Sequence, residues 1–537
     1  MDVALLLGSL AVSVVVWYLV AVLRRGGEAG RTKQAKIKAP LPPGPRGWPV
    51  LGNLPQLGSK PHHTMCALAR EYGPLFRLRF GSAEVVVAAS AGVAAQFLRA
   101  HDANFSSRPP NSGAEHVAYN YQDLVFAPYG ARWRALRKLC ALHLFSAKAL
   151  DDLRGVREGE VALMVRQLAA TRQGGGGSEA AVALGQVANV CATNTLARAT
   201  VGRRVFAVDG GEGAREFKEM VVELMQLAGV FNVGDFVPAL AWLDPQGVVA
   251  KMKRLHRRYD GMMDGIIREV NKAADAHGNK DLLSVLLARM REQQPLADGE
   301  DGTINETDIK ALLLNLFTAG TDTTSSTVEW ALAELIRHPD VLAKAQQELD
   351  AVVGRGRLVS ESDLPRLTYL PAVIKETFRL HPSTPLSLPR VAAAECEVAG
   401  YRIPRGTTLL VNVWAIARDP EAWGPGDPLE FRPARFLPGG SHAGVDVKGS
   451  DFELIPFGAG RRICAGLSWG LRMVTLMTAA LVHALDWELP DGVDADKLDM
   501  EEAYGLTLQR AVPLMVRPAP RLMPSAYVHA HEHAAAE

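Results

Sequence analysis

The chain has 537 residues, with 59 Lys and Arg against 58 Asp and Glu, which leaves a net charge of +1. This length is sufficient for one large domain with a sizeable core and excludes a small disulfide-stapled module. A balanced charge provides no overall field for holding a polyanion, so we expect no nucleic-acid partner. The five cysteines are odd in number and form no CxxC pair, which favours reduced thiols.

Residues 3–23 carry no charged side chain. At about 1.5 Å per residue, a helix of this length crosses the hydrocarbon core of a bilayer. The run exceeds the about 7–15 apolar residues of a cleavable signal, so we expect a retained membrane helix, with a buried core helix as the alternative. Six basic residues and one acid, Glu28, follow before residue 39, which places the body of the chain in the cytosol. Residues 1–38 are therefore predicted to be a single-pass anchor with a basic flank, in the endoplasmic reticulum of a plant or animal cell.

Residues 39–50 contain five prolines, which stiffen the backbone and remove amide donors. They are predicted to form a rigid hinge, with an ordinary linker as the alternative. Residues 51–518 show no further break in composition apart from a glycine run at residues 174–177, which is expected to be a surface loop. Helical periodicity dominates this part of the chain, so we expect one helix-rich catalytic domain with a minor sheet.

Two segments of this domain have strand patterns. Residues 75–89 predict a hairpin that turns at Gly81-Ser82, and residues 398–413 predict two short strands separated by Pro404-Arg405-Gly406. Residues 519–537 are expected to be a disordered tail. Its three histidines, which fit solvated polar sequence better than a metal site, are His529, His531 and His533.

Cys464 lies in the segment Phe-Gly-Ala-Gly-Arg-Arg-Ile-Cys-Ala-Gly, residues 457–466, before a helical pattern over residues 467–485. Glycines let backbone amides turn toward the sulfur, and a helix start beside two arginines stabilises a thiolate. Such a thiolate can ligate iron. An inert packing cysteine is the competing interpretation of the loop taken alone.

One long helical pattern covers residues 305–338, opened by the capping pair Asn305 and Asp308. Its middle, residues 320–327, reads Gly-Thr-Asp-Thr-Thr-Ser-Ser-Thr, a cluster of poor helix formers. Hydroxyls that compete for backbone carbonyls can open a helix and make room for a small molecule and water. We predict that Asp322 and Thr323 form a proton-delivery pair, with a solvated face or an interhelical contact as the alternative.

Two further pairs have helical spacing. Glu376 and Arg379 share one face of a short helix and form either a structural latch or an ordinary surface ion pair. Trp133 and Arg137 are four residues apart and could offer an indole donor and a guanidinium to one carboxylate, with solvated basic surface as the alternative.

Taken in order, the proline-rich segment after an anchor, WxxxR, AGTDTT, ExxR and FGAGRRICAG resemble the haem-thiolate monooxygenases, the cytochrome P450 superfamily. The resemblance implies the cytochrome P450 fold, mainly α with a minor β region, preceded by one N-terminal transmembrane helix. It implies a haem b whose iron is held by Cys464. It also implies that Glu376 and Arg379 form a latch with Arg435, although Ala434 stands where the family usually has glutamate. The residues implied to bind the haem propionates are Trp133, Arg137, Arg390 and Arg462.

Residues 104–110, 445–456 and 504–510 are more specifically similar to plant flavonoid 3'-hydroxylases. This resemblance implies that one atom of O2 enters the flavonoid B ring at the 3' position, in substrates such as naringenin, dihydrokaempferol or kaempferol, while the other atom is reduced to water. The residues implied to line the substrate pocket are Ala319, Thr384, Leu386, Leu506 and Thr507.

No GxGxxG motif follows a strand pattern, so NADPH is expected to act through a separate flavoprotein reductase, as the resemblance also implies. Arg132, Arg134 and Lys138 are predicted as a docking face for the acidic surface of that reductase. The nearest rival function is flavonoid 3',5'-hydroxylation. Another plant haem-thiolate hydroxylase of aromatic substrates is a further alternative. A hydroperoxide isomerase is more distant, because Asp322 and Thr323 are intact. A haem sensor without turnover is equally distant, and consumption of O2 coupled to NADPH would distinguish it.

Overall fold

The computed structural model of the protein describes residues 38–171, 181–207, 211–274, 281–293, 303–424 and 426–528. The chain divides into two units, Met1–Pro40 and Leu41–Glu537, and the architecture described below is that of the second. Three predicted features lie outside the described residues: the membrane helix at residues 3–23, the loop at residues 174–177, and the tail histidines.

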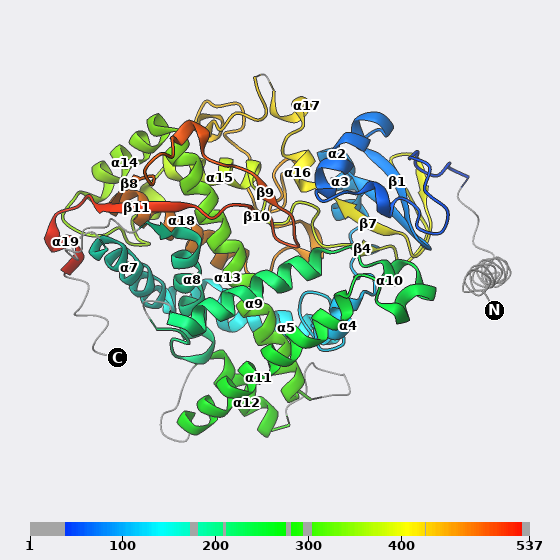
Figure 1. Cartoon of the computed structure of the whole chain (residues 1–537), viewed down its shortest axis with the longest axis horizontal. Helices are drawn as coiled ribbons and strands as arrows, with labels where there is room; N and C mark the ends of the chain where they lie inside the picture. Colours follow the sequence, from blue (N-terminus) through cyan, green and yellow to red (C-terminus); the bar gives the residue numbers. More distant parts are fainter. Residues whose placement is uncertain are drawn as a thin grey trace, which may run out of the picture. The chain divides into compact units, whose positions relative to one another are not determined.

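Helices dominate the second unit, which confirms the predicted mainly α fold class (Figure 1). The helices are α2 (Pro61–Tyr72), α3 (Ala91–Ala95), α4 (Ser112–His116), α5 (Ala131–Cys140), α6 (Ala147–Asp152), α7 (Arg154–Ala170), α8 (Leu184–Val201), α9 (Gly211–Gly229), α10 (Val233–Phe236), α11 (Val248–Ala274), α12 (Leu282–Arg291), α13 (Glu306–Arg337), α14 (Pro339–Val353), α15 (Tyr369–Leu380), α16 (Val413–Ile416), α17 (Pro420–Trp423), α18 (Leu467–Ala484) and α19 (Pro524–Val528).

In the described part of the chain, the strands form four small sheets, and the largest, with β1 (Leu75–Phe80) and β7 (Thr408–Val411), lies on the right in Figure 1. The other strands are β2 (Ala83–Ala88), β3 (Val182–Ala183), β4 (Arg390–Val391), β5 (Cys396–Val398), β6 (Tyr401–Ile403), β8 (Leu485–Glu488), β9 (Glu502–Ala503), β10 (Gln509–Arg510) and β11 (Met515–Pro520). The hairpin β1–β2 turns at Gly81-Ser82 as predicted, and its sheet has the order β1-β2-β7-β4, with β2 and β7 parallel. The two strands expected within residues 398–413 are β6 and β7, which pair with different partners.

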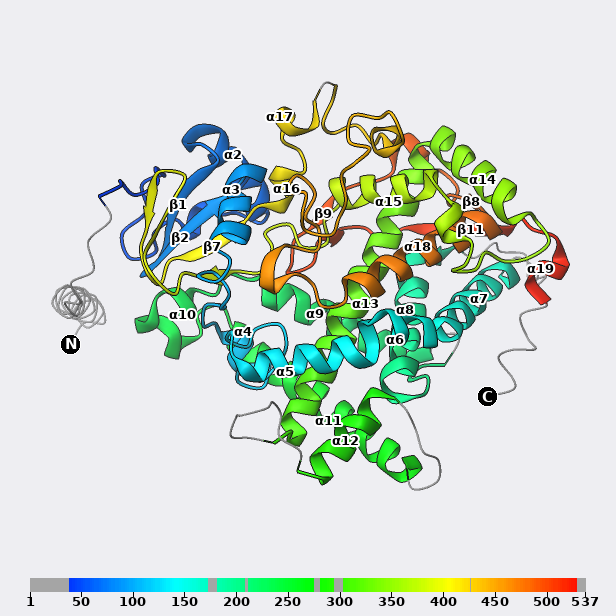
Figure 2. The same ribbon diagram turned by 180° about the vertical axis from the view of Figure 1, so that it is seen from behind.

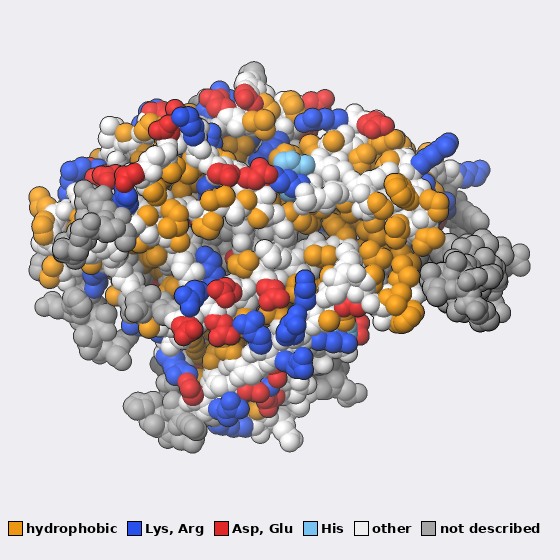
Figure 3. All heavy atoms as spheres, viewed as in Figure 1, with side chains coloured by type: hydrophobic (Ala, Val, Ile, Leu, Met, Phe, Trp, Pro, Cys, Tyr) orange, Lys and Arg blue, Asp and Glu red, His pale blue; other side chains and the backbone are white. Residues whose placement is uncertain are grey.

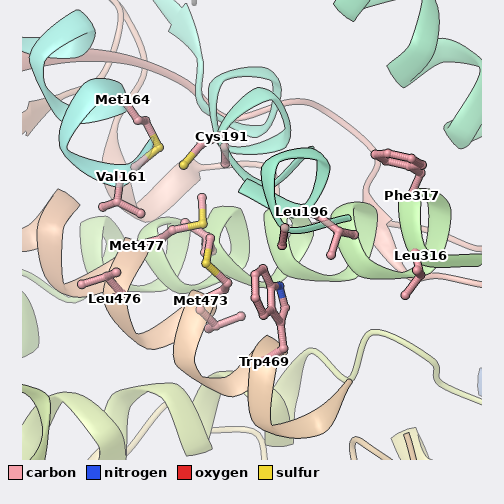
Figure 4. Packing of buried hydrophobic residues seen from close by; sticks show 14 of the residues in the cluster. Val161, Met164, Cys191, Leu196, Leu316, Phe317, Trp469, Met473, Leu476 and Met477 are labelled. Carbon is pink, nitrogen blue, oxygen red and sulfur yellow. The ribbon is translucent and has the colours of Figure 1, made fainter. Parts of the chain in front are cut away.

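Helix α13 passes through the centre of the helical core and packs against α8 and α18 (Figure 4). Asn305 and Asp308 form the predicted capping box at its start. The predicted opening of α13 at residues 320–327 is wrong, because the helix is continuous there. The hydroxyls of Thr321 and Thr327 donate to the carbonyls four residues back, at 2.6 and 2.8 Å, and add to the helical hydrogen bonds without replacing them.

The predicted hinge is partly built into the sheet. The amide of Arg77 in β1 donates to the carbonyl of Pro43 at 2.7 Å. A Cβ atom at Gly44 would lie 1.9 Å from the carbonyl oxygen of Arg77, so only glycine permits this approach. Residues 41–50 are therefore packed on β1, which is not expected of a free spacer.

The predicted disordered tail begins too early. Strand β11 continues to Pro520 and pairs with β8, and α19 follows. Tyr527 in α19 donates its hydroxyl hydrogen to the carbonyl of Ala484 at 2.5 Å and accepts from the amides of Arg521 and Leu522. The sequence pattern did not predict this ordered segment, because β11 and Tyr527 are held by β8 and Ala484, which come earlier in the chain.

Among the described residues, one helix is long and apolar enough to cross a membrane, namely α18, and two thirds of it is buried inside the protein. Its position beside α13 explains this composition, because a helix covered on most sides by protein needs apolar residues around most of its circumference. We therefore interpret α18 as a core helix.

Charged side chains of both signs are interspersed over α9 and α11 on the face drawn in Figure 3. Arg258 of α11 pairs with Glu216 of α9 at 2.8 Å, for example. This mixture agrees with the net charge of +1.

Candidate haem and substrate site

A cavity of about 310 Å³ lies between α13, the segment before α18 and the loop before α5. Residues 311–336 of α13 are buried except for Ala319, Gly320 and Thr323, which share one face and line this cavity. A helix that is otherwise covered by protein thus exposes side chains only into the cavity. Ala319 and Thr323 occupy the wall on which the sequence analysis expected them.

Cys464 lines the same cavity and is the only one of the five cysteines that is exposed, although what it faces is a cavity surrounded by protein. The loop before it is shaped by Gly458 and Gly460, both at φ +70°, a conformation that glycine adopts without strain. A Cβ atom at Gly460 would lie 2.3 Å from Oδ1 of Asp102, so the loop is held close against the segment after α3. Burial raises the pKa of the Cys464 thiol, and the amide of Gly466 and the charge of Arg137 oppose that rise.

Two buried arginines in the cavity wall each have a guanidinium nitrogen without a hydrogen-bond partner. They are Arg390, whose Nη2 donates to the carbonyl of Ala459 at 2.8 Å, and Arg462, whose Nε donates to the carbonyl of Ser106 at 2.6 Å. In both residues Nη1 is buried and has no partner among the described residues. Burial lowers the pKa of each to about 10. Arg390 Nη1 does lie 3.7 Å from Asp102 Oδ1, an ion-pair contact that is too long for a hydrogen bond. Buried guanidinium nitrogens without a hydrogen-bond partner are suited to an anionic ligand.

Trp133 and Arg137 also line the cavity. Trp133 Nε1 donates to the carbonyl of Leu124 at 3.0 Å, and its contact with a propionate stays a prediction. The indole ring stacks against two guanidinium groups, with the Cζ atoms of Arg462 and Arg137 at 4.4 and 5.4 Å from its centre. Trp133 therefore positions Arg137 and Arg462 for the predicted ligand.

The donor set fits a haem with two propionates. A cysteine sulfur faces the cavity, and the two orphaned Nη1 atoms provide cationic donors near it. These residues would hold the iron and the propionates respectively. The fit depends on unpartnered atoms of the protein itself and not on any one motif.

Asp322 does not face the cavity. Its carboxylate is buried and accepts hydrogen bonds from Thr507 Oγ1 at 2.5 Å and from Gln509 Nε2 at 2.7 Å. Burial raises the pKa of Asp322, and these two hydrogen bonds oppose the rise. Asp322 therefore attaches the non-helical chain at residues 507–509 to α13, which is neither the predicted direct pair with Thr323 nor the interhelical contact of the alternative. Thr323 alone presents its hydroxyl on the cavity side.

Four of the five predicted pocket residues line the cavity, and Leu386 does not. Leu386 is 4% exposed and packs in a separate cluster beside the β1–β2 sheet. Thr384 and Ser387 line the cavity on either side of it. The chain direction at residues 384–388 was not visible in the sequence, and the resemblance alone placed Leu386 on the wrong side.

The comparisons with known proteins agree with this geometry. A family model described as cytochrome P450 matches residues 42–515. The cytochrome P450 family includes this chain. The protein is 81% identical over 530 residues to a flavonoid 3'-monooxygenase of Oryza sativa subsp. japonica, which covers 97% of this chain and 98% of the relative. It is 63% identical over 492 residues to a flavonoid 3'-monooxygenase of Petunia hybrida, which covers 91% and 94%. A flavonoid 3',5'-hydroxylase of Solanum melongena is 45% identical over 518 residues and covers 96% of each chain.

Membership of the cytochrome P450 family confirms the predicted fold family, the haem cofactor and the haem-thiolate monooxygenase class. Membership of this family also implies a separate redox partner that supplies electrons to the haem.

The latch of this cytochrome P450 is assembled as the resemblance implied. Arg379 donates to both carboxylate oxygens of Glu376 at 2.7 and 2.8 Å, and Arg435 Nε donates to the same carboxylate at 3.0 Å. All three side chains are fully buried. Arg435 also reaches the carbonyls of Trp423 and Glu430, so the network is closed without a carboxylate at Ala434.

Three polar residues of the site were missed, of which Asp123 and Asn315 are buried and Arg108 is half-buried. Arg108 lines the cavity and donates to the carbonyls of Leu388 and Pro389, at 2.8 and 3.0 Å. Asn315 and Asp123 form a hydrogen-bonded pair beneath the loop before α5. Asn315 had a visible signal, since it is the one polar residue in the apolar run 311–317. Asp123 and Arg108 had none, because their partners are backbone groups of distant segments.

The predicted reductase face is smaller than expected. Arg132 pairs with Asp308 at the start of α13, where α5 lies beside that helix (Figure 2). Arg134 and Lys138 are exposed on the outer face of α5. Only these two of the three cations remain available to an acidic partner.

Proposed function

We propose that this cytochrome P450 hydroxylates the B ring of flavonoids at the 3' position, with O2 and with electrons from NADPH delivered by a flavoprotein reductase. The observation that carries the proposal is a single cavity in which the thiol of Cys464, two guanidinium groups that each have a nitrogen without a hydrogen-bond partner, and the hydroxyl of Thr323 are combined. The substrate class follows from the relatives, since those named flavonoid 3'-monooxygenase are 60–81% identical to the chain over most of its length.

The bound haem would supply the oxidising chemistry, with the thiolate donating electron density to the iron. The protein's own residues bind and orient the reactants. Arg390 and Arg462 hold the propionates, and the Gly466 amide stabilises the Cys464 sulfur as thiolate. The Thr323 hydroxyl donates to the carbonyl of Ala319 at 2.8 Å, which leaves its oxygen free to accept a hydrogen bond from water or substrate. Thr323 Oγ1 is therefore the atom at which we expect a proton-donating water to be held.

The cavity wall suits a planar aromatic molecule that carries hydroxyl groups. Its apolar surface is provided by Leu506, Phe126 and Leu314, among others. Hydroxyl groups interrupt this surface at separate positions, and Thr327 Oγ1 and Ser383 Oγ bond to each other at 3.1 Å. A few polar groups in an otherwise apolar pocket orient a ligand, since each unmatched group costs binding free energy.

Product analysis tests the proposal. Full-length protein is incubated with reductase, NADPH, isotopically labelled O2 and naringenin, and the product is analysed by mass and position of the new hydroxyl. We expect one labelled oxygen in each product molecule, at the 3' position. Absence of any hydroxylated flavonoid from protein with a normal haem spectrum would contradict the proposal.

The second candidate is flavonoid 3',5'-hydroxylation, which is the activity named for the Solanum melongena relative. The same incubation separates the two, because a 3',5'-hydroxylase adds two labelled oxygens. The higher identity to the 3'-monooxygenases favours the single addition.

We also propose that residues 1–38 anchor the protein in the endoplasmic reticulum membrane with the catalytic part in the cytosol, and that residues 39–50 connect the two parts. The uncharged run at residues 3–23 and the basic residues after it support this arrangement. Deletion of residues 2–23 should shift the protein toward the soluble fraction and preserve its haem spectrum. Arg134 and Lys138 are proposed as reductase contacts, so their joint replacement by Glu should slow haem reduction without affecting substrate binding.

A further inference from the structure

The loop at residues 122–127 forms part of the cavity wall, and a buried amide holds it on α13. Asn315 Oδ1 accepts hydrogen bonds from the amides of Leu124 at 2.7 Å and Val125 at 3.0 Å. Asn315 is 8% exposed, stands in an apolar run and itself lines the cavity. Its carbonyl oxygen is therefore the acceptor that the protein provides for these two backbone groups. The side chain of Asn315 thus accepts hydrogen bonds from two backbone amides of the loop.

Asp123 holds the same loop from within. Its carboxylate accepts from the amides of Phe126 at 2.9 Å and Ala127 at 3.0 Å, and Asn315 Nδ2 donates to its other oxygen at 3.0 Å. Asp123 is fully buried. The charged groups that face it electrostatically are Arg108 and Arg462, and its remaining neighbours are amides.

This loop contacts both halves of the site. The side chains of Leu124, Val125 and Phe126 line the cavity. The loop carbonyls accept from groups that surround the proposed propionate site: Trp133 on Leu124, Arg108 on Val125, and Arg462 on Ala127. A displacement of the loop would therefore alter the pocket wall and the haem surroundings together.

We propose that Asn315, acting through Asp123 and the loop, is a positioning residue that determines how tightly and in which orientation the aromatic substrate is held. This inference rests on the proposed function. Asn315 does not need to touch the reacting atoms, because it acts by fixing the side chains of residues 124–126. An aliphatic residue at this position would leave the Leu124 amide without its acceptor. The Val125 amide and Asp123 Oδ2 would each lose one partner and keep only their mutual hydrogen bond at 3.2 Å.

Asn315→Asp provides a test that a merely structural role would not pass. The new carboxylate keeps the acceptor for the loop amides but removes the donor to Asp123, and two buried carboxylates then face each other. Such a pair shares one proton at lower pH, and the shared O–H restores a hydrogen bond between the two side chains. Burial already raises the pKa of Asp123 to about 6 in the wild-type protein. Loop placement in the variant should therefore be lost at alkaline pH and recovered at acidic pH.

The measurement is the dissociation constant of naringenin from the ferric holoprotein, followed by the substrate-induced change of the Soret band at about pH 8 and about pH 6. We expect Asn315→Asp to bind about tenfold more weakly than wild type at the higher pH and within about twofold at the lower pH. Imidazole, which needs only access to the iron, should bind to both proteins equally. The matched control is Asn189→Asp, which makes the same change at a buried residue that contacts Ser325 of α13 but lies outside the cavity wall.

A variant-to-wild-type ratio for naringenin that is unity at both pH values would overturn the inference, and so would an equal pH dependence in Asn189→Asp. If Asn315→Asp does not retain haem, Asn315→Ala is measured in its place, with weaker naringenin binding at both pH values and unchanged imidazole binding expected. Unchanged naringenin binding in that variant would also overturn the inference. Failure of the wild-type protein to bind naringenin would contradict the proposed function instead, so the two failures are distinguishable.

Discussion

Two groups of buried arginines in this protein differ in whether a carboxylate is hydrogen-bonded to them. In the latch, Arg379 and Arg435 share the carboxylate of Glu376 and leave little of its hydrogen-bonding capacity unused. In the cavity, Arg390 and Arg462 bond to backbone carbonyls, and each keeps an Nη1 without a hydrogen-bond partner. Arg390 Nη1 forms an ion pair with Asp102 Oδ1 at 3.7 Å, a separation that is too long for a hydrogen bond.

The difference separates structural cations from binding cations. A buried guanidinium with its own carboxylate is neutralised within the fold, and removal of the acid leaves uncompensated charge. A buried guanidinium that has no hydrogen-bonded carboxylate has lost its hydration, and binding of an external anion can offset that free-energy cost. The first group should therefore determine folding, and the second should determine retention of the haem.

The largest expected effect is that of Glu376→Leu, which strands two guanidinium groups in the interior. We expect a loss of about 3–5 kcal/mol of stability and little recoverable haem protein, because breaking a buried pair costs more than the pair contributes. Thermal unfolding and the yield of the reduced carbon monoxide complex measure this. Glu430→Gln is the control, since Arg379 and Arg435 bond to its backbone carbonyl and not to its side chain. Equal yields of haem protein from Glu376→Leu and Glu430→Gln would contradict a special structural role for the arginines of the latch.

Arg390→Met should behave in the opposite way. Removal of a cation that has no hydrogen-bonded carboxylate should change the stability of the protein by no more than about 1 kcal/mol, whereas haem should dissociate about tenfold faster because one propionate partner is lost. The rate of haem transfer to excess apomyoglobin measures this, with Arg405→Met on the exposed turn between β6 and β7 as the control. Haem retention equal to wild type would place the propionates elsewhere.

Asp123→Asn sharpens the comparison, because Asp123 is an acid near the cavity arginines that bonds to amides. Burial raises its pKa to about 6, above the value of about 3.9 for an unfolded chain, so folding takes up a proton between these values. The contribution of Asp123 to stability is thus largest at low pH and falls as the pH rises toward 6. We expect the stability of wild type relative to Asp123→Asn to decrease by about 1 kcal/mol between about pH 5 and pH 8. Chemical unfolding at several pH values measures this, and a difference that does not vary with pH would contradict it.

The smallest expected effect is that of Thr507→Val, which keeps the branched shape and removes the hydroxyl that Asp322 accepts from. Gln509 still donates to Asp322, so we expect a loss of about 1 kcal/mol of stability. Because Thr507 also lines the cavity, the ratio of singly to doubly hydroxylated flavonoid should change while the haem spectrum does not. Unchanged product ratios with several flavonoids would remove Thr507 from the pocket.

The sequence predicted those parts of the fold that depend on neighbouring residues, such as turns and helix ends. Gly81-Ser82 identified the β1–β2 turn, and Asn305 with Asp308 identified the start of α13. The polar cluster at residues 320–327 was misread because its hydroxyls were expected to compete with the helix, whereas they bond within it or to neighbouring segments.

The site was predictable where one residue type can perform one task, as for Cys464 beside its glycines. It was not predictable where a side chain has two possible directions. Asp322 turns toward Thr507 and Leu386 packs beside the sheet, and each of these outcomes depends on a distant segment of chain.

The central claim is that the thiol of Cys464 holds a haem in the cavity lined by Arg390 and Arg462. The reduced carbon monoxide spectrum of Cys464→Ala tests it most directly, with Cys66→Ala, at a half-buried cysteine of α2, as the matched control. The claim predicts that the red-shifted Soret band of a thiolate-bound haem is lost in Cys464→Ala and retained in Cys66→Ala. A red-shifted band that survives in Cys464→Ala would contradict the claim.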